Sequence, residues 1–358
     1  MKSPIYSRSI LLTGAAGFVG SNVLIYLFNK YPNYFFTVLD ALTYSGDIKN
    51  IPDYIHKARN FQFVYGDVRN QKIVDSLISR VDTVLHFAAE THVARSIYDD
   101  AVFFETDILG TQCIASAVLK HRKNIKRFIH ISTSEVYGTA LKRTMDESHP
   151  LNPQSPYAAA KAGADRLIYS YITTYKLPIV IVRLFNIYGK QQHLEKLIPR
   201  FITSCILNEP LTIHGTGQSS RDFTYVDDIS RALDSVAHAD KNKVDGEVFN
   251  IGSGKDYTVR GIADLVMKIM ARHPTGKNKE IQYSRHAIHI GDRPGQVFRH
   301  TASIKKIGNT LKWCPQVSFR DGLEKTVYWY VDNRAWWNEK VHMRHVPIET
   351  EGGKTELH

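Results

Sequence analysis

The feature that most constrains the fold is a glycine-rich turn between an apolar segment and an amphipathic one. Residues 9–12 (SILL) form the apolar segment, and residues 13–20 (TGAAGFVG) form the turn. Its three glycines allow a tight turn, a close approach to a pyrophosphate and close packing of helix on strand. A helix that begins here presents free amides and the positive end of its dipole to phosphates. The turn predicts a dinucleotide site, although an ordinary strand–helix turn has the same pattern. The residues expected at this site are Gly14, Gly17, Phe18 and Val19.

Apolar strands alternate with helical patterns through the first half of the chain. Further strand-like segments are expected at residues 35–40, 61–65, 83–87, 128–132 and 178–183. Between them lie helical patterns, the longest at residues 102–119 and 157–174. This alternation is typical of a parallel sheet with helices on both faces. We therefore predict an α/β fold built on a Rossmann-type, doubly wound parallel sheet.

The pattern changes after about residue 185. Glycine and proline become more frequent, and short strands (211–214, 247–251) are mixed with helices (198–207, 259–271). We expect a dinucleotide-binding domain over residues 1–185 and a smaller C-terminal α/β substrate lobe over residues 186–345. Strand segments around residues 222–252 are expected to return to the first domain. The polar residues 346–358 are expected to form a loosely ordered tail.

The ends of the next three strands carry residues that suit a dinucleotide. Asp40 ends the second strand about twenty residues after the turn, where an acid can hold a ribose 2′-hydroxyl and repel a 2′-phosphate. An acid follows the third strand, where it can reach the adenine edge, and small residues follow the fourth. The order of these features favours NAD over NADP. The expected contacts are Asp40, Asp67, Val68, Phe87, Ala88 and Ala89.

A tyrosine and a lysine open the long helical pattern at residues 157–174. Tyr157 and Lys161 are four residues apart and so share one helix face. A nearby ammonium group lowers a phenol pKa towards neutrality, as a hydroxyl-deprotonating base needs. An isolated pair of this kind is more often an ordinary surface pair. Thr133, at the end of the fifth strand, favours a shared cleft, because ligands bind beyond the carboxyl ends of parallel strands.

Together these motifs resemble the extended short-chain dehydrogenase/reductase family over nearly the whole chain. Within it, the chain is similar to the nucleotide-sugar 4,6-dehydratases, particularly the dTDP-glucose type. The resemblance is highly specific for the family and moderately specific for the reaction. The segments that carry it are residues 87–93 (FAAETHV), 95–96 (RS), 133–138 (TSEVYG), 195–199 (EKLIP), 221–223 (RDF) and 291–295 (GDRPG).

The resemblance implies a closed redox cycle in which NAD ends unchanged. Tyr157 would take the proton of the sugar 4-hydroxyl while hydride passes from C4 to NAD. Glu135 would then abstract the acidified C5 hydrogen, the C6 hydroxyl would leave, and the hydride would return to C6. The implied catalytic set is Thr133, Ser134, Glu135, Tyr157 and Lys161.

The chain departs from the dTDP-glucose pattern at Ser134, where those enzymes usually carry an aspartic acid that protonates the leaving hydroxyl. A serine cannot do so at neutral pH, so water or Glu135 must supply the proton. Thr-Ser-Glu also occurs in GDP-mannose 4,6-dehydratases and in UDP-glucuronate decarboxylases. Ala94 and Gln296 likewise replace a usual Asp and His, which makes an altered sugar or nucleotide preference plausible.

The resemblance also implies a set of substrate contacts in the second lobe and beside the cleft. Two arginines suit a diphosphate because they form bidentate, charge-assisted hydrogen bonds. The implied contacts are His92, Thr133, Asn186, Lys196, Leu197, Arg221, Asn250 and Arg293, with Arg299 a weaker candidate.

The leading prediction is an NAD-dependent 4,6-dehydratase of UDP-glucose, dTDP-glucose or a related nucleotide hexose. A UDP-glucuronate decarboxylase is the alternative, motivated by Ser134. A 4-epimerase is less favoured because those enzymes usually lack a carboxylate at the Glu135 position. An inert NAD-binding protein is less favoured because Thr133, Tyr157 and Lys161 are intact.

Composition adds few constraints. The formal net charge is +11, but the one short basic cluster, residues 120–127, is typical of a solvated helix end, so no nucleic-acid partner is expected. Three scattered cysteines predict neither a disulfide framework nor a metal site. We find no apolar run long enough to span a bilayer and no signal-like N-terminus, and we expect a cytoplasmic protein. The helical patterns at 102–119 and 157–174 resemble the family's dimer interface and predict a homodimer.

Overall fold

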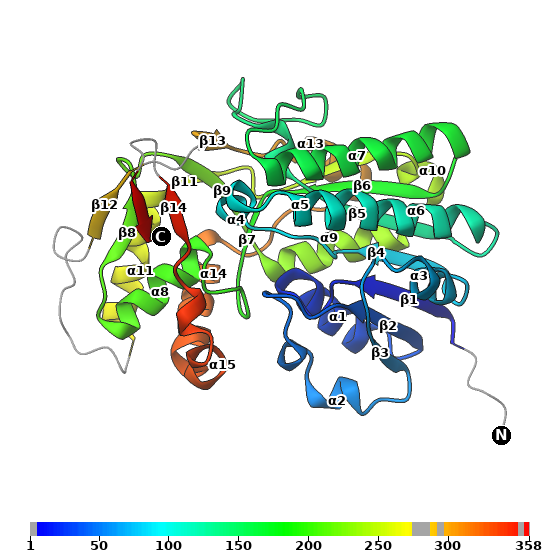
Figure 1. Ribbon diagram of the computed structural model, residues 1–358, viewed down its shortest axis with the longest axis horizontal. Helices are drawn as coiled ribbons and strands as arrows, with labels where there is room; N and C mark the ends of the chain where they lie inside the picture. Colours follow the sequence, from blue (N-terminus) through cyan, green and yellow to red (C-terminus); the bar gives the residue numbers. More distant parts are fainter. Residues whose placement is uncertain (1–5, 274–286, 292–296, 350–353, 358) are drawn as a thin grey trace.

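The computed structural model describes residues 6–273, 287–291, 297–349 and 354–357, and within these the chain folds into two lobes (Figure 1). The larger lobe contains a seven-stranded sheet with the order β10-β6-β5-β4-β1-β2-β3. All of its neighbouring strands are parallel. The predicted Rossmann-type sheet is confirmed. Its strands are β1 (Arg8–Thr13), β2 (Tyr34–Asp40), β3 (Phe61–Tyr65), β4 (Thr83–His86), β5 (Arg127–Thr133), β6 (Ile179–Leu184) and β10 (Val248–Ile251).

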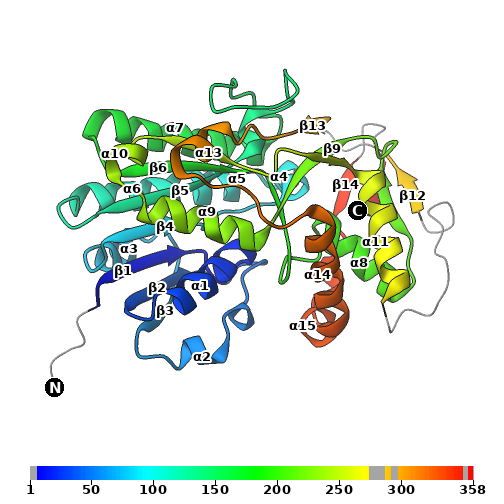
Figure 2. The same cartoon turned by 180° about the vertical axis from the view of Figure 1, so that it is seen from behind.

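The strands are apolar throughout because both faces of the sheet are covered. Along β1, Leu12 packs into the core on one face and Leu11 into the core on the other. The first face is covered by α1 (Phe18–Lys30) and α9 (Val226–His238), which lie side by side in Figure 2. The opposite face is covered by α3 (Gln71–Ile78), α6 (Thr111–Lys120) and α7 (Pro156–Tyr175). Shorter helices of this lobe are α2 (Asp53–His56), α4 (Val93–Tyr98), α10 (Lys241–Val244) and α13 (Lys305–Leu311), with the 3-10 turns η1 (Ile48–Asn50) and η3 (Ser134–Tyr137).

The strand order reverses between β1 and β4. The chain moves outward through β2 and β3 on one side, and through β5 and β6 on the other. Loops that leave the carboxyl ends of β1 and β4 therefore part in opposite directions and leave a crevice between them. In open parallel sheets, ligands bind at this switch point.

The helix expected at residues 102–119 is interrupted. The stretch consists of α5 (Ala101–Phe103), a π-helical segment η2 (Phe104–Gly110) and α6. Within η2, Asp107 is fully buried and its Oδ1 accepts a hydrogen bond from the backbone of Glu90 at 2.8 Å. π-helical segments inside α-helices are frequent at functional sites.

The second lobe has its own apolar core, formed where α8 (Leu197–Leu207), α11 (Val259–Arg272) and α14 (Phe319–Asp332) pack together. The chain then returns from the second lobe to the large lobe, where β10 pairs with β6 at the edge of the large sheet. The other elements are β7 (Asn186–Tyr188), β8 (Leu211–His214), β9 (Ser220–Tyr225), β11 (Asp256–Thr258), β12 (Ala287–Ile290), β13 (Arg299–His300), α15 (Arg334–Asn338) and η4 (Val341–Met343).

The polar tail contains a short element of regular structure. Its described residues form two short antiparallel strands, β14 (Pro347–Glu349) and β15 (Thr355–Leu357). Arg344, just before them, is almost fully buried and donates to Glu209 and Ser204 of the second lobe. These hydrogen bonds attach the start of the tail to the second lobe.

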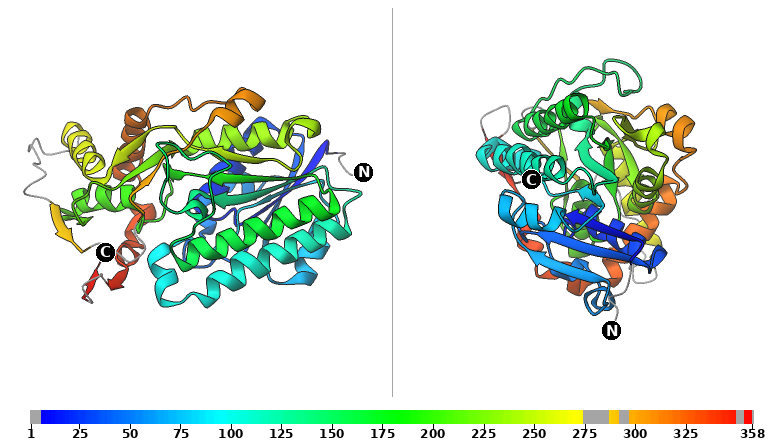
Figure 3. Two further views of the ribbon diagram at one scale, coloured as in Figure 1. Left: turned by 90° about the horizontal axis from the view of Figure 1, so that it is seen from above. Right: turned by 90° about the vertical axis from the view of Figure 1, so that its right-hand side faces the viewer.

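One described segment contradicts the expectation that no apolar run could span a bilayer. Ala101–Lys120 meets the criteria of length and mean hydropathy, and 44% of its most apolar window is buried. The segment packs against α3 and α7, and the left view of Figure 3 shows it running beside α7. A core helix passes the same test, and this segment packs in part within the large lobe.

Candidate active site

Two connected cavities lie at the carboxyl edge of the large sheet. The first, of about 360 Å³, extends across the ends of β1 to β6. The second, of about 250 Å³, lies between β5 and the second lobe. Thr133, Tyr157 and Asn186 line both. The first cavity brings together all of the predicted cofactor residues, namely Gly14, Gly17, Phe18, Val19, Asp40, Asp67, Val68, Phe87, Ala88, Ala89, Tyr157 and Lys161.

The glycine turn has the geometry that an anion site requires. Gly14 has a positive φ of 71°, and a Cβ there would lie 2.5 Å from the backbone nitrogen of Ala88. A Cβ at Gly20 would lie 2.7 Å from the Cα of Ala15. The N-cap of α1 is Gly17, which has no side-chain cap, so the first amides of the helix are left to face a pyrophosphate.

Asp40 is held in place by two backbone amides. Its Oδ2 accepts from Ala16 and its Oδ1 accepts from Leu42, each at 2.8 Å. Burial raises the pKa of Asp40, and these two hydrogen bonds oppose that rise. An oriented carboxylate at this position can accept hydrogen bonds from the adenosine ribose.

Tyr157 and Lys161 both lie buried at the start of α7. The helix begins at Ser155, whose Oγ accepts from the amide of Ala158 at 3.2 Å. Lys161 donates through Nζ to the carbonyl oxygen of Ile131 at 2.9 Å, and the hydroxyl of Tyr157 is hydrogen-bonded to Thr133. The helix start thus directs both side chains to the end of β5.

The sequence predicted a lowered pKa for Tyr157, and this prediction is wrong because the pKa is raised in this structure. Burial raises the pKa of Tyr157, the Asp107 carboxylate raises it further, and only the hydrogen bond with Thr133 opposes the rise. Burial likewise lowers the pKa of Lys161. Loss of hydration disfavours both charged forms and outweighs the attraction between them.

Asp107 is a further buried titratable residue next to this pair. Burial raises its pKa from the ordinary 3.8 to about 7, and the positive charge of Lys161 opposes the rise. Its Oδ2 has no hydrogen-bond partner. Sequence reasoning missed Asp107 because it sits inside an apolar helical pattern, where only its polarity marks it.

Ser134 and Glu135 follow β5 in η3 and line the second cavity. The Oγ1 of Thr133 accepts from the amide of Glu135 at 3.2 Å and so caps this turn. Ser134 Oγ lies 3.3 Å from Nδ1 of His300, and Glu135 Oε1 lies 3.7 Å from the same nitrogen. Thr133 and Tyr157 therefore form the wall that the two cavities share, with Lys161 on the side of the first cavity and Ser134 and Glu135 on the side of the second. Behind Ser134 and Glu135 lies a buried histidine, His300, that the sequence did not indicate.

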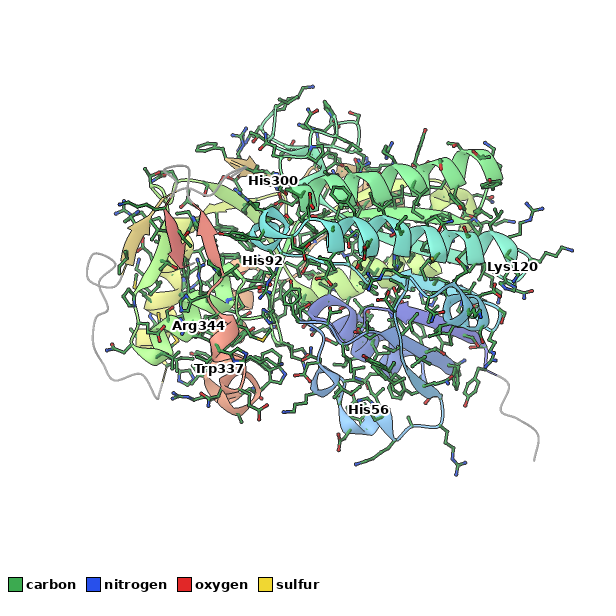
Figure 4. The ribbon with its side chains drawn as sticks, in the orientation of Figure 1. His56, His92, Lys120, His300, Trp337 and Arg344 are labelled. Carbon is green, nitrogen blue, oxygen red and sulfur yellow. The ribbon has the colours of Figure 1, made fainter. Side chains whose placement is uncertain are left out.

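Five of the remaining predicted substrate residues line the second cavity, and Figure 4 labels one of them, His92, near the junction of the lobes. Nδ1 of His92 accepts from the amide of Arg95 at 3.2 Å and caps α4. Lys196, the N-cap of α8, donates to the carbonyl of Thr91 at 3.0 Å. The five are His92, Asn186, Lys196, Leu197 and Arg221.

Asn250 does not reach the cavity, so its prediction as a substrate contact is corrected. The residue is fully buried, and its amide donates to the carbonyl of Met145 at 3.0 Å while its oxygen accepts from the hydroxyl of Tyr137 at 2.7 Å. Tyr137 in turn accepts from Arg183 at 2.9 Å. Asn250 therefore ties β10 to the turn that carries Ser134. Arg293 lies outside the described residues.

Two basic side chains that the sequence did not indicate also line the second cavity. Arg200 lies three residues after Leu197 on α8 and donates to the carbonyl of Thr212 at 3.2 Å. His214 ends β8, and its Nδ1 lies 3.0 Å from the carbonyl of Gly291. Helical spacing from Leu197 could have indicated Arg200, whereas no local signal marks His214. With Arg221 they give this end of the cavity a basic character suited to a diphosphate.

No group of three or more His, Cys, Asp or Glu side chains is arranged as a metal site among the residues that the structure describes. The three cysteines are free thiols.

Comparison with known proteins agrees with this geometry. A sequence model of the family described as GDP-mannose 4,6 dehydratase matches residues 11–326. The chain belongs to this family. A dTDP-glucose 4,6-dehydratase of Streptomyces niveus is 41% identical over 92% of this chain and 94% of its own length. The human dTDP-D-glucose 4,6-dehydratase is 35% identical over 96% of both chains.

Solved structures of the family are similar over the same range. DesIV, a dTDP-glucose 4,6-dehydratase from Streptomyces venezuelae determined with NAD and TYD bound, has a TM-score of 0.85 and 36% identity. The matched region covers 92% of this chain and 99% of the DesIV chain. A UDP-glucuronic acid 4-epimerase from Bacillus cereus, with UDP-glucuronic acid and NAD, has a TM-score of 0.81 and 31% identity. The predicted resemblance is thus confirmed.

Proposed function

We propose that the protein is an NAD-dependent nucleotide-sugar 4,6-dehydratase that acts on dTDP-glucose, UDP-glucose or a closely related nucleotide hexose. The observation that carries the proposal is the shared wall of the two cavities. Thr133 and Tyr157 line both of them, so a cofactor in one and a sugar in the other would meet at these side chains. The proposal also draws on relatives that are dehydratases of dTDP-glucose.

The first cavity fits NAD, which supplies a hydride acceptor for C4 of the sugar when it is bound. Gly14 and Gly17 would hold the pyrophosphate against α1, and Asp40 would hold the adenosine ribose. Tyr157 would take the proton of the 4-hydroxyl as the C4–H bond breaks. The positive charge of the oxidised nicotinamide would favour the phenolate, because an opposite charge nearby lowers a phenol pKa.

Elimination would then take place at the other end of the shared wall. A ketone at C4 acidifies the hydrogen on C5, and Glu135 lies in the second cavity, where it can accept that proton. The C6 hydroxyl leaves as water once it receives a proton, which gives an enone. Hydride return to C6, with addition of a proton from water to C5, restores the oxidised cofactor and leaves a 4-keto-6-deoxy sugar.

Decarboxylation of a nucleotide hexuronate is the second candidate. Ser134 favours it, because loss of carbon dioxide from a β-keto acid needs no acid for the C6 oxygen. The segments FAAETHVARS (87–96) and GDRPG (291–295) favour dehydration, since decarboxylases do not share them in this form. The dehydratase names of the relatives support the same choice.

We also propose that the protein is a homodimer that uses η2 and α7 as its interface. Leu109 on η2 is 55% exposed, and Tyr169 on α7 is 43% exposed, on two segments that pack against each other. Large apolar side chains gathered on one face are typical of protein–protein contacts. We further propose that the boundary between the two domains lies at residue 185 and that the protein is cytoplasmic.

The test is to incubate the purified protein separately with dTDP-glucose, UDP-glucose, GDP-mannose and UDP-glucuronate and to read each product mass. Loss of water from a nucleotide hexose supports the proposal. Loss of carbon dioxide from UDP-glucuronate supports the decarboxylase instead. An unchanged mass with epimerised product supports a 4-epimerase, and no product from any sugar supports an inert NAD-binding protein.

A further inference from the structure

A histidine from a distant part of the chain contacts both residues that follow Thr133. His300, in β13, is fully buried, and its Nδ1 lies 3.3 Å from Ser134 Oγ and 3.7 Å from Glu135 Oε1. Figure 4 labels His300 above His92, near the junction of the two lobes. Nδ1 is within hydrogen-bond distance of the Ser134 hydroxyl, and a small movement of the Glu135 carboxyl group would bring that group within the same distance. The nitrogen can then exchange a proton with each of them in turn.

The other ring nitrogen is already engaged. Nε2 of His300 lies 2.7 Å from the carbonyl oxygen of Gly138, which can only accept, so Nε2 carries a hydrogen. In the neutral imidazole, Nδ1 is then the acceptor and faces Ser134 and Glu135 with a lone pair. The turn that presents this carbonyl requires glycine, because Gly138 has a φ of 68° and a Cβ there would collide with the carbonyl of Asn152.

The strand that carries His300 is fixed on two sides. His300 pairs with Arg221 of β9, and the amide of Met145 donates to the carbonyl of Thr301 at 2.8 Å. These backbone contacts fix the position of His300, and the hydrogen bond from Nε2 to the Gly138 carbonyl orients its ring towards Ser134. Such a fixed position suits a group that must act at two atoms in succession.

We propose that His300 passes the proton that Glu135 takes from C5 of the sugar to Ser134, and thence to the departing C6 hydroxyl. This inference rests on the proposed dehydratase function. The C5–H bond breaks and its electrons form the C5–C6 double bond as the C6–O bond breaks. Glu135 gives the proton to Nδ1, the imidazolium gives it to Ser134 Oγ, and Ser134 gives its own hydrogen to the leaving oxygen. Water departs, and all three side chains end as they began.

The surroundings favour a neutral histidine before the reaction. Burial lowers the pKa of His300, and the charges of Arg221 and His149 lower it as well, while Glu135 and the Gly138 carbonyl oppose them. A neutral Nδ1 is ready to accept a proton when Glu135 acquires one. A serine hydroxyl alone is too weak an acid for this task, so the imidazole gives Ser134 a role in the elimination.

The test separates C4 oxidation from elimination. The holoenzyme carrying His300→Gln keeps an amide for the Gly138 carbonyl but cannot take up a proton. Mixed with dTDP-glucose, it should still form enzyme-bound NADH. It should then release water about 100-fold more slowly than wild type, the scale of general acid–base catalysis. NADH absorbance and the mass of the 4-keto hexose report the first step, and the 4-keto-6-deoxy product reports the second. His342→Gln, at an exposed site in η4 of the second lobe, is the matched control and should behave as wild type.

Variants of Ser134 provide an independent test of the relay if the His300→Gln variant folds poorly. Ser134→Ala should also accumulate NADH, and adding His300→Gln to it should cost no further rate, because both remove one relay. Ser134→Asp should restore elimination in the His300→Gln background, since a carboxylic acid can donate directly. Wild-type elimination by His300→Gln, or an equal loss of both steps, would overturn the relay. No product from wild type with any of the four sugars would instead overturn the proposed function.

Discussion

The ammonium group of Lys161 donates to the backbone carbonyl of Ile131, 2.9 Å away at the end of β5. This hydrogen bond holds the positive charge beneath the shared wall of the two cavities, one helical turn from Tyr157. Burial nevertheless raises the pKa of Tyr157, so the phenol is neutral in this structure. The proposed base therefore needs a further positive charge, which the oxidised nicotinamide would bring.

Replacing Tyr157 tests its assignment as the base. Tyr157→Phe should lower kcat by about 10³-fold, within the range of general base catalysis, while NAD stays bound because the residues around the pyrophosphate are untouched. Turnover and the cofactor content of the purified variant are the measurements. Tyr169→Phe, an exposed tyrosine on the same helix, is the control and should keep full activity. Activity retained by Tyr157→Phe would remove the phenol from the mechanism.

Asn250 should matter for stability rather than for substrate binding. Asn250→Ala leaves the hydroxyl hydrogen of Tyr137 without its acceptor, and an unpaired buried polar group costs about 1–3 kcal/mol. Urea unfolding should show this loss, and the KM for the nucleotide sugar should change little. Asn242→Ala, at an exposed site, should unfold as wild type does. A large rise in KM with unchanged stability would restore Asn250 as a substrate contact.

The sequence predicted the site residues that a local pattern marks. It missed the contacts that form between segments far apart in the chain. Gly14, Gly17 and Asp40 are marked by their spacing after a strand, and the first cavity includes them as expected. Asn250 follows the motif of the family, but its direction depends on Tyr137, which lies 113 residues earlier. His300 meets Ser134 across 166 residues, a separation that no periodicity can reveal.

The sequence alone also could not predict the protonation states of Tyr157, Lys161 and Asp107. The Tyr157–Lys161 spacing predicts a lowered phenol pKa, but the sign depends on how completely both groups leave water. Asp107 contributes as well, from the π-helical segment η2. Its effect on Tyr157 and Lys161 follows from packing, which the apolar pattern of residues 102–119 does not specify.

Asp107 should make stability depend on pH. Its pKa rises from 3.8 to about 7 on folding, so between these values the folded chain holds a proton that the unfolded chain releases. Stability from this group is fully present below about pH 4 and is lost as pH rises through 7. Relative to Asp107→Asn, wild type should therefore lose free energy of unfolding from pH 4 to pH 8. Asp256→Asn, at an exposed site, should show no such difference, and parallel curves for wild type and Asp107→Asn would contradict the shift.

The proposed dimer interface can be tested at Leu109. Leu109→Arg places a charge in the centre of the exposed apolar face on η2, and burying an unpaired charge at an interface costs several kcal/mol. Sedimentation should find wild type dimeric and Leu109→Arg monomeric at micromolar concentration. Leu141→Arg, on an exposed loop outside η2 and α7, should stay dimeric. A monomeric wild type would exclude the homodimer.

The path of the hydride tests the central claim most directly. The protein is incubated with dTDP-glucose that carries deuterium at C4, and the product is analysed by mass and by NMR. The proposed cycle predicts a 4-keto-6-deoxy sugar that has lost water and carries the deuterium at C6. A product with deuterium restored to C4, or one that has lost the label, would contradict a dehydration driven by transient oxidation at C4.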